Sequence, residues 1–315
     1  MSWLCYDDTS TLGGVLLLGD EIMADKGFKA IDEQINLLKS RGLQIDDEQQ
    51  ARDFLYRNNY YRISGYSLTL RHHDVFSKHA TFQNIMDIYW FDHKLRHILL
   101  TYLEIIEVSV KSVYAHEFTK LHGPTGYLDT GYFTDQKKHH DIITKAEDQK
   151  NARRPHEAYL KHFMDDLHQD IPLWAYVDLL TISDISFLYS ISESDLKQTV
   201  ANAFGLPMSR GPELLGKFMH SMTILRNLCA HGSRLYNRLF EQRPSLNKGE
   251  LALLRKNPDG TVDNTHLYGF ILIMRRLLKE EDFRRMKDEM IALKSEYPFV
   301  KMKYYGFRDD WKAAL

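Results

Sequence analysis

Apolar residues recur at steps of three and four along most of the chain, which is the spacing of one face of an α-helix. In the segment FKAIDEQINLLKSRGL, residues 28–43, the apolar residues lie along one side, namely Ile31, Ile35, Leu37 and Leu38. The longest pattern of this kind covers residues 81–116 and contains neither glycine nor proline. These patterns predict a mostly helical protein with long amphipathic helices.

Further segments have the same period. They cover residues 46–66, 171–190, 211–232 and 267–297. In the first, Asp46 or Asp47 is expected to cap the helix, and Gly65 closes a tyrosine-rich stretch. In the second, Pro172 occupies the first turn, where proline is tolerated. Strands, if there are any, are expected to be few and short.

The loop and polar stretches predict the organisation of the chain. Glycine and proline mark a loop at residues 123–133. We expect an all-α fold built of helical bundles, divided into four parts. These are a short irregular N-terminal arm (1–25), an N-terminal helical region (26–122), polar connecting helices (123–170) and a C-terminal helical region (171–315).

Composition narrows the classes of partner. The chain has 315 residues, of which 43% are apolar, enough for a sizeable core. Its formal net charge is −2, so it is not a general polycation. If it binds nucleic acid, a local basic patch must do so.

The cysteines and the N-terminal residues predict the compartment. Cys5 and Cys229 lie far apart in the sequence, which indicates a reduced, cytoplasmic protein without a disulfide framework. The run VLLLG near the N-terminus is too short to cross a bilayer and lacks the basic residues that precede an export signal. We therefore expect no membrane segment and no export signal.

The stretch RNLCAHGSRLYNR, residues 226–238, ends a helical apolar pattern with polar and basic side chains. Asn227 and His231 are four residues apart and lie on one side of the helix. Arg226 is about 140° away from His231 around the axis, at ~3.6 residues per turn. The two side chains are therefore expected to flank a groove where the helix ends.

Gly232 is expected to be the first residue beyond the helix. The imidazole of His231 then lies at the negative end of the helix dipole, which favours its protonated form. Such a group is suited to general acid–base catalysis, and the guanidinium of Arg226 can grip phosphate oxygens. Together they suffice for metal-free RNA cleavage, in which the ribose 2′-hydroxyl attacks the adjacent phosphate. Only RNA carries that hydroxyl.

The residues after His231 have two interpretations. Cations near a helix C-terminus are stabilising without any catalysis. Arg234 and Arg238 are four residues apart with Tyr236 between them, and basic residues interleaved with an aromatic are also typical of an RNA-binding surface.

At these residues the sequence resembles a known family. RNLCAH is similar to the Arg-polar-x3-His motif of the HEPN superfamily, all-helical domains that include metal-independent endoribonucleases. The wider pattern resembles the AbiD/AbiF-type (Abi-like) abortive-infection proteins of bacteria. The segments that carry this likeness are LLKSRGLQIDDEQQARDFLYRNNYYRISGY, FDHKLRHILLTYLEIIEVSVKS, PLWAYVDLLTISDISFLYS, RNLCAHGSRLYNR and YYGFRDDW.

The resemblance implies roles for individual residues. Arg226 and His231 would be catalytic, and Asn227 would orient or assist them. Arg234, Asn237 and Arg238, with Tyr236, would contact RNA or hold the end of the active-site helix. The resemblance also implies anti-phage defence, a toxin–antitoxin arrangement with a structured non-coding RNA, and no cofactor. The alternative is an RNA-binding or regulatory module that holds such an RNA without cutting it.

A second pair of residues repeats the spacing of the motif. Lys111 and His116 are five apart near the end of the long helical pattern, where the family favours arginine in place of the lysine. The first interpretation is a degenerate second motif in residues 26–122, which would complete the active site within one chain. Otherwise Lys111 forms an ordinary i,i+4 pair with Glu107, and a homodimer would bring together two copies of residues 226–231.

One histidine pair has the spacing of a metal site. His93 and His97 are four residues apart on the long helix, which is compatible with zinc. No HExxH glutamate lies between them and no third ligand is evident, so we expect no metal.

Overall fold

The computed structural model describes residues 27–315, so the predicted arm, residues 1–25, lies outside the described residues. The described part is helical apart from one small hairpin and isolated bridges, which confirms the predicted all-α fold. In the hairpin, β1 (Arg71–His72) pairs antiparallel with β2 (Val75–Phe76).

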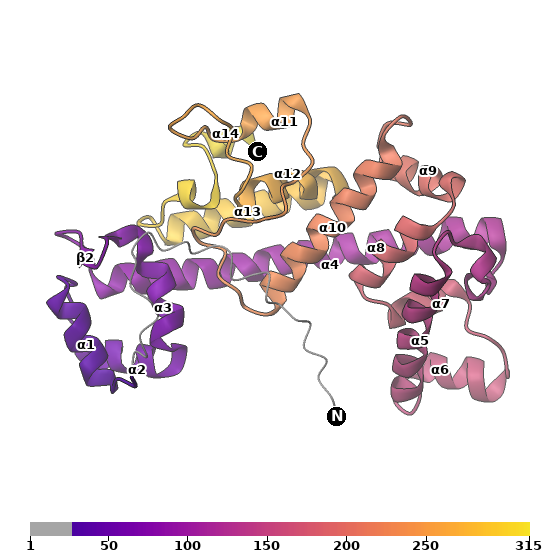
Figure 1. Cartoon of the computed structure of the whole chain (residues 1–315), viewed down its shortest axis with the longest axis horizontal. Helices are drawn as coiled ribbons and strands as arrows, with labels where there is room; N and C mark the ends of the chain where they lie inside the picture. The colour runs from indigo at the N-terminus through magenta and orange to yellow at the C-terminus, as the bar shows by residue number, and fades with distance from the viewer. Residues whose placement is uncertain (1–26) are drawn as a thin grey trace.

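One long helix, α4 (Phe82–His122), runs along the longest dimension of the molecule, and the other helices pack around it (Figure 1). Its N-cap is Thr81, whose hydroxyl accepts a hydrogen bond from the Asn84 N–H while the Asn84 side chain accepts one from the Thr81 N–H. The helix predicted over residues 81–116 is confirmed, and it continues until Gly123 follows with φ 80°.

Three helices pack near the N-terminal end of α4. They are α1 (Ile31–Ser40), α2 (Glu48–Asn58) and α3 (Tyr60–Ser67), followed by the 3₁₀ turn η1 (Leu68–Leu70). Asp47 caps α2, as predicted. The helical segment is then broken by Asn59, which has φ 62° and starts α3 by accepting a hydrogen bond from the Tyr61 N–H. The prediction that Gly65 closes this segment is wrong, since Gly65 lies inside α3.

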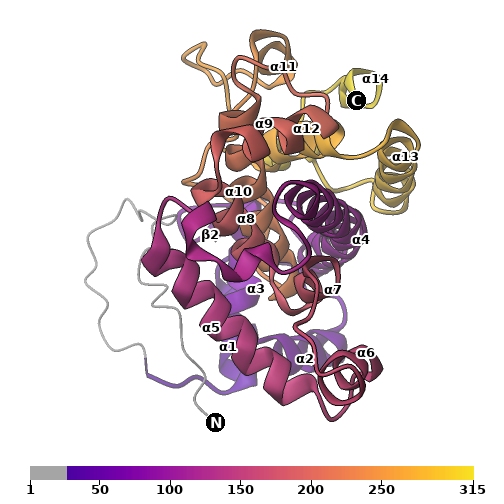
Figure 2. The same cartoon turned by 90° about the vertical axis from the view of Figure 1, so that its right-hand side faces the viewer.

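The middle of the chain packs around the C-terminal half of α4, where both views place α7 beside it (Figures 1 and 2). Its elements are η2 (Gly126–Leu128), η3 (Thr130–Tyr132), α5 (Gln136–Arg153), α6 (Ala158–Lys161), η4 (His162–Asp166), α7 (Leu173–Tyr176), η5 (Val177–Leu179), α8 (Ile182–Ile191) and α9 (Ser194–Ala203). The single helix predicted over residues 171–190 is therefore wrong. It divides because Leu180 is extended and Thr181 caps α8 through the Asp184 N–H.

The C-terminal part lies along the other side of α4. Its elements are α10 (Gly211–Ala230), α11 (Lys248–Leu253), α12 (Leu267–Leu277), α13 (Glu280–Glu296), η6 (Met302–Tyr305) and α14 (Trp311–Ala314). Since α4 packs against α3, α8, α10 and α13, it contacts helices from both the predicted N-terminal and the predicted C-terminal helical regions. The boundaries of the four predicted parts stay a prediction. No helix in the described part has the length and apolar character needed to cross a membrane.

Candidate functional site

The candidate site begins where α10 ends. His231 is the C-cap and its side chain is exposed, and Gly232 follows in the left-handed conformation with φ 66°. The Gly232 N–H donates to the Cys229 carbonyl at 3.1 Å, and the Ser233 N–H donates to the Leu228 carbonyl at 2.8 Å. This pair of hydrogen bonds is a Schellman motif. The predicted role of Gly232 as the first residue beyond the helix is confirmed.

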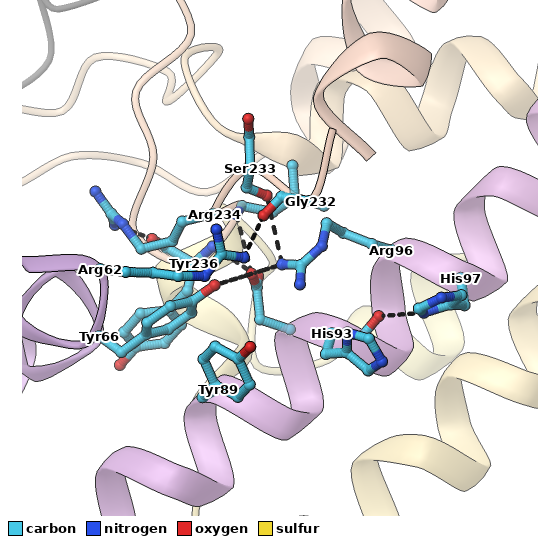
Figure 3. Close-up of polar contacts among 12 residues, drawn as sticks. Arg62, Tyr66, Tyr89, His93, Arg96, His97, Gly232, Ser233, Arg234 and Tyr236 are labelled. Carbon is cyan, nitrogen blue, oxygen red and sulfur yellow. Dashed lines mark hydrogen bonds and ion pairs between the residues drawn. The ribbon is translucent and has the colours of Figure 1, made fainter. Parts of the chain in front are cut away.

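Two arginines from other helices bind the exposed carbonyls at this helix end (Figure 3). Arg62 of α3 donates from Nη2 to the Gly232 carbonyl, and Arg96 of α4 donates from Nη1 to the Ser233 carbonyl at 3.4 Å. Cations stabilise the negative end of a helix dipole. The two residues that follow His231 are therefore held in place from α3 and α4.

A buried carboxylate fixes the segment that follows. Asp92 of α4 is 0% exposed and forms a buried ion pair with Arg96. Its carboxylate also accepts hydrogen bonds from the Tyr66 hydroxyl (2.9 Å), the Tyr305 hydroxyl (3.0 Å), the Leu235 N–H (3.2 Å) and the Tyr236 N–H (2.8 Å). Charge-assisted bonds of this kind are the strong ones. Asp92 thus ties the chain after α10 to the long helix.

The two tyrosines that serve Asp92 are held in their protonated form. Burial raises the pKa of Tyr66 well above its ordinary value, and the neighbouring Asp92 carboxylate raises it further. Burial and Asp92 raise the pKa of Tyr305 in the same way. Both hydroxyls therefore stay protonated and donate hydrogen bonds to the carboxylate.

Several residues of the basic tail are built into the fold. Arg234 donates from Nη1 to the Tyr236 carbonyl and packs on Gly65, where a Cβ would lie 3.0 Å from its Nε. Asn237 has φ 49° and donates its N–H to the Tyr304 carbonyl at 2.9 Å. These contacts are those of residues that hold the helix end, which is one of the two roles proposed for them.

The expectation for Tyr236 requires a correction. Its ring is 1% exposed, stacked on Tyr66, and its hydroxyl shares a hydrogen bond with Thr69. A buried ring cannot stack on an RNA base, so Tyr236 supports the helix end instead. Arg238 lies with its guanidinium 5.9 Å from the Phe240 ring centre, and a role in RNA binding stays a prediction for it.

Arg226 and Lys111 both form ion pairs with the carboxylate of Glu107. Arg226 Nε lies 3.5 Å from Glu107 Oε2, and Lys111 Nζ lies 2.8 Å from Glu107 Oε1. The i,i+4 pair of Glu107 and Lys111 is therefore present, as the sequence indicated. Because Arg226 is on α10 while the other two are on α4, the helix contact brings the basic ends of the two motifs together.

The histidines of the two motifs are both exposed. His231 lies at the end of α10, next to the exposed Asn227 one turn earlier. His116 has a side chain that is 75% exposed, and it lines a groove beside α7. Arg226 is ion-paired with α4 whereas His231 lies at the helix end, and no direct contact joins them within residues 27–315. The geometry is two neighbouring cations with a histidine five residues beyond each.

The His93 and His97 rings lie 4.4 Å apart on α4, and His97 Nδ1 is 2.9 Å from the His93 carbonyl. Partial burial lowers the pKa of His93, and the neighbouring His97, Arg96 and Arg62 lower it further (Figure 3). In residues 27–315 no group of three or more His, Cys, Asp or Glu side chains is placed to hold a metal ion.

Fold and site together define an all-helical protein with a basic, histidine-bearing cluster where α10 meets α4. A family model for Abi-like proteins matches residues 53–237, more than half of the chain. The chain therefore belongs to the Abi-like protein family, and membership suggests a part in abortive infection, a defence against phage. No curated protein and no solved structure matches it.

Sequence reasoning missed residues that act through tertiary contacts. Asp92 had one visible signal, a carboxylate four residues before Arg96 in an otherwise apolar helical pattern. Arg62 had none, because its partner is a backbone carbonyl far along the chain. The ion pair of Glu107 with Arg226 depends on which helices are neighbours, and periodicity within one helix does not give that.

Proposed function

We propose that this protein is a metal-independent endoribonuclease of a bacterial abortive-infection or toxin–antitoxin system, as the HEPN resemblance implies. The observation that carries the proposal is the shared contact of Arg226 and Lys111 with Glu107. It places two cations side by side, the 41% exposed Arg226 and the 14% exposed Lys111, each followed five residues later by an exposed histidine. That is the local basic patch a protein of net charge −2 needs to bind RNA.

Each side chain has a chemical role in this proposal. The 41% exposed side chain of Arg226 uses Nε for Glu107, and its outer nitrogens contact the scissile phosphate. Lys111 adds a second positive charge. His231 accepts the proton of the 2′-hydroxyl or donates one to the departing 5′-oxygen. His116 does not reach the same phosphate, because α10 ends beside Arg96 and His116 lies twenty residues further along α4, about 30 Å at ~1.5 Å per residue, so the complementary proton transfer falls to solvent. The negative charge that develops on the phosphate is stabilised by the two cations.

The shared carboxylate supports the arrangement in which one chain supplies both cations, Arg226 and Lys111, to the phosphate. The homodimer, in which two copies of residues 226–231 face each other, is the alternative arrangement. In both, RNA is the partner and no cofactor is needed.

The direct test is cleavage of RNA by the purified protein. Wild type should cut RNA in the presence of EDTA and leave 2′,3′-cyclic phosphate ends. His231→Ala should lower the cleavage rate at least about a hundredfold, since general acid–base groups contribute ~10²–10⁴-fold. Arg226→Ala should also lower the rate, because the scissile phosphate loses its contact with the guanidinium. His220→Ala, an exposed histidine on the same helix, is the matched control and should cleave like wild type.

Expression without a partner should arrest growth, and His231→Ala should remove the arrest. Cleavage that needs a metal ion and leaves 5′-phosphates would contradict the mechanism. So would a His231→Ala variant that still arrests growth.

The second candidate is a module that binds a structured non-coding RNA without cutting it. It is favoured by one observation, the separate surroundings of Arg226 and His231. Sequencing the RNA that co-purifies with wild type and with Arg226→Ala separates the two. A single intact RNA that is lost in the variant, together with no cleavage, supports the binding module.

A further inference from the structure

A groove lies between α4 and α7, outside the cluster at Glu107. It has a volume of about 460 Å³, within the range of sites that hold small ligands. Its lining is Ser112, Ala115, His116, Thr119, Lys120 and Trp174. All but the tryptophan come from successive turns of α4, so the floor of the groove is one face of a rigid helix.

Trp174 forms the wall from α7 and is unusual in its exposure. Its neighbours Leu173 and Tyr176 are buried in the core, whereas the Trp174 side chain is 58% exposed. A flat, rigid indole at the edge of a groove offers a stacking surface for a planar ring. Trp174 lies in α7, a helix of one turn that follows Pro172. Its side chain points away from the core, whereas Leu173 and Tyr176 point into it.

The opposite side of the groove is polar and carries positive charge. Lys120 and His116 are both exposed there, and Ser112 and Thr119 add hydroxyl groups. One carboxylate, Glu117, lies 3.9 Å from both His116 Nε2 and Lys120 Nζ. An aromatic wall facing an ammonium group and hydroxyls matches a base on one side and a phosphate on the other.

We propose that this groove binds one nucleotide of a single-stranded RNA, with the base stacked on Trp174 and the phosphate beside Lys120. The inference rests on the proposed function and names a binding subsite for its substrate. Ser112 lies about 100° around the helix axis from Lys111, and His116 lies about 7.5 Å along the axis from Lys111, at ~3.6 residues per turn and ~1.5 Å per residue. A strand that winds about a quarter turn around α4 therefore passes from the Arg226 and Lys111 pair into the groove.

The test measures binding without cleavage. The probe is a fluorescein-labelled 2′-O-methyl oligouridine of eight nucleotides, in which the hydroxyl that cleavage needs is blocked. Anisotropy titrations should show that Trp174→Ala weakens binding at least about fivefold, the loss expected for one stacked base. Trp174→Phe, which keeps an aromatic face, should stay within about threefold of wild type. Lys120→Ala should weaken binding and reduce its dependence on salt.

Trp90→Ala is the matched control, because Trp90 is also partly exposed on α4 but lies outside the groove. It should bind like wild type, and circular dichroism should show that every variant is folded at the temperature of the titration. Equal binding by Trp174→Ala and wild type would overturn the proposal, and so would equal losses in Trp174→Ala and Trp90→Ala.

The experiments distinguish an error in the groove proposal from an error in the nuclease proposal. If Trp174→Ala binds and cleaves normally while His231→Ala is inactive, the groove is wrong and the nuclease stands. If Trp174→Ala loses binding while wild type never cleaves, the groove stands and the nuclease is wrong.

Discussion

At the scale of single residues, Glu107 determines the state of the candidate site. Its carboxylate neutralises two cations that RNA would otherwise meet unpaired. A phosphate that binds Arg226 must therefore compete with a carboxylate already in place. The Glu107 carboxylate therefore weakens the electrostatic attraction between RNA and this surface.

Replacing Glu107 by Gln should therefore strengthen RNA binding several-fold, because it removes the competing charge and keeps the shape of the side chain. Anisotropy with the 2′-O-methyl oligouridine measures the effect. Glu104→Gln removes the same charge about one turn away and should have a smaller effect. Equal effects of the two variants would show that only net charge matters and that the contact with Arg226 does not.

The sequence predicted this region in part. The spacing from Arg226 to His231 and the position of Gly232 are local, so the pattern gave the helix end correctly. The burial of Tyr236 could not be predicted from such a local pattern. A tyrosine between two arginines is compatible with a surface or with a core, and the choice is made by Asp92, which binds its N–H from another helix.

At the scale of elements, the end of α10 is stabilised by its attachment to α4 more than by its own sequence. Arg62 and Arg96 bind the carbonyls of Gly232 and Ser233, which follow the helix. Asp92 binds the N–H groups of Leu235 and Tyr236. The buried Asp92–Arg96 pair is the centre of this attachment. Removing one partner of a buried ion pair leaves the other charge without compensation.

Asp92→Ala should lower the free energy of unfolding by about 3–5 kcal/mol, the typical cost of breaking a buried pair. Urea unfolding followed by circular dichroism gives this value. Asp87→Ala, on the same helix and only partly buried, is the control and should change stability little. A loss below about 1 kcal/mol for Asp92→Ala would contradict the role given to this carboxylate.

Helix boundaries were predicted well where a local signal exists and poorly where it does not. Asp47 and Pro172 lie at the helix starts that their residue types indicate. The breaks at Asn59 and Leu180 were missed because the apolar period continues across them. Gly65 was predicted to end a helix, but it lies inside α3, and the Arg234 side chain packs where a Cβ would be.

At the scale of the whole molecule, α4 is the support on which the site is built. Asp92, Glu107, Lys111 and His116 all belong to it, and α10 and α7 bring Arg226 and Trp174 to its surface. The sequence predicted a long helix and a second basic residue on it. It could not predict that α10 crosses α4 near Glu107, since that depends on how all the helices pack.

The arrangement within one chain predicts the outcome of mixing two inactive variants. Lys111→Ala and Arg226→Ala proteins, unfolded together and refolded, should remain inactive in RNA cleavage, because each chain lacks one of its two cations. Refolded wild type is the control. Recovery of activity in the mixture would mean that the two cations come from different subunits. In the homodimer arrangement Lys111 takes no part, so a Lys111→Ala protein that cleaves like wild type would contradict the arrangement within one chain.

The uninterrupted length of α4 has one further consequence. A helix without a bend transmits rotation along its whole length, so the turn on which each side chain sits is fixed relative to the others. One extra residue between Lys111 and His116 would twist the groove by about 100° around the axis relative to Glu107, at ~3.6 residues per turn. Homologous chains with this site should therefore tolerate length changes in the loops around α4 but none in this five-residue interval.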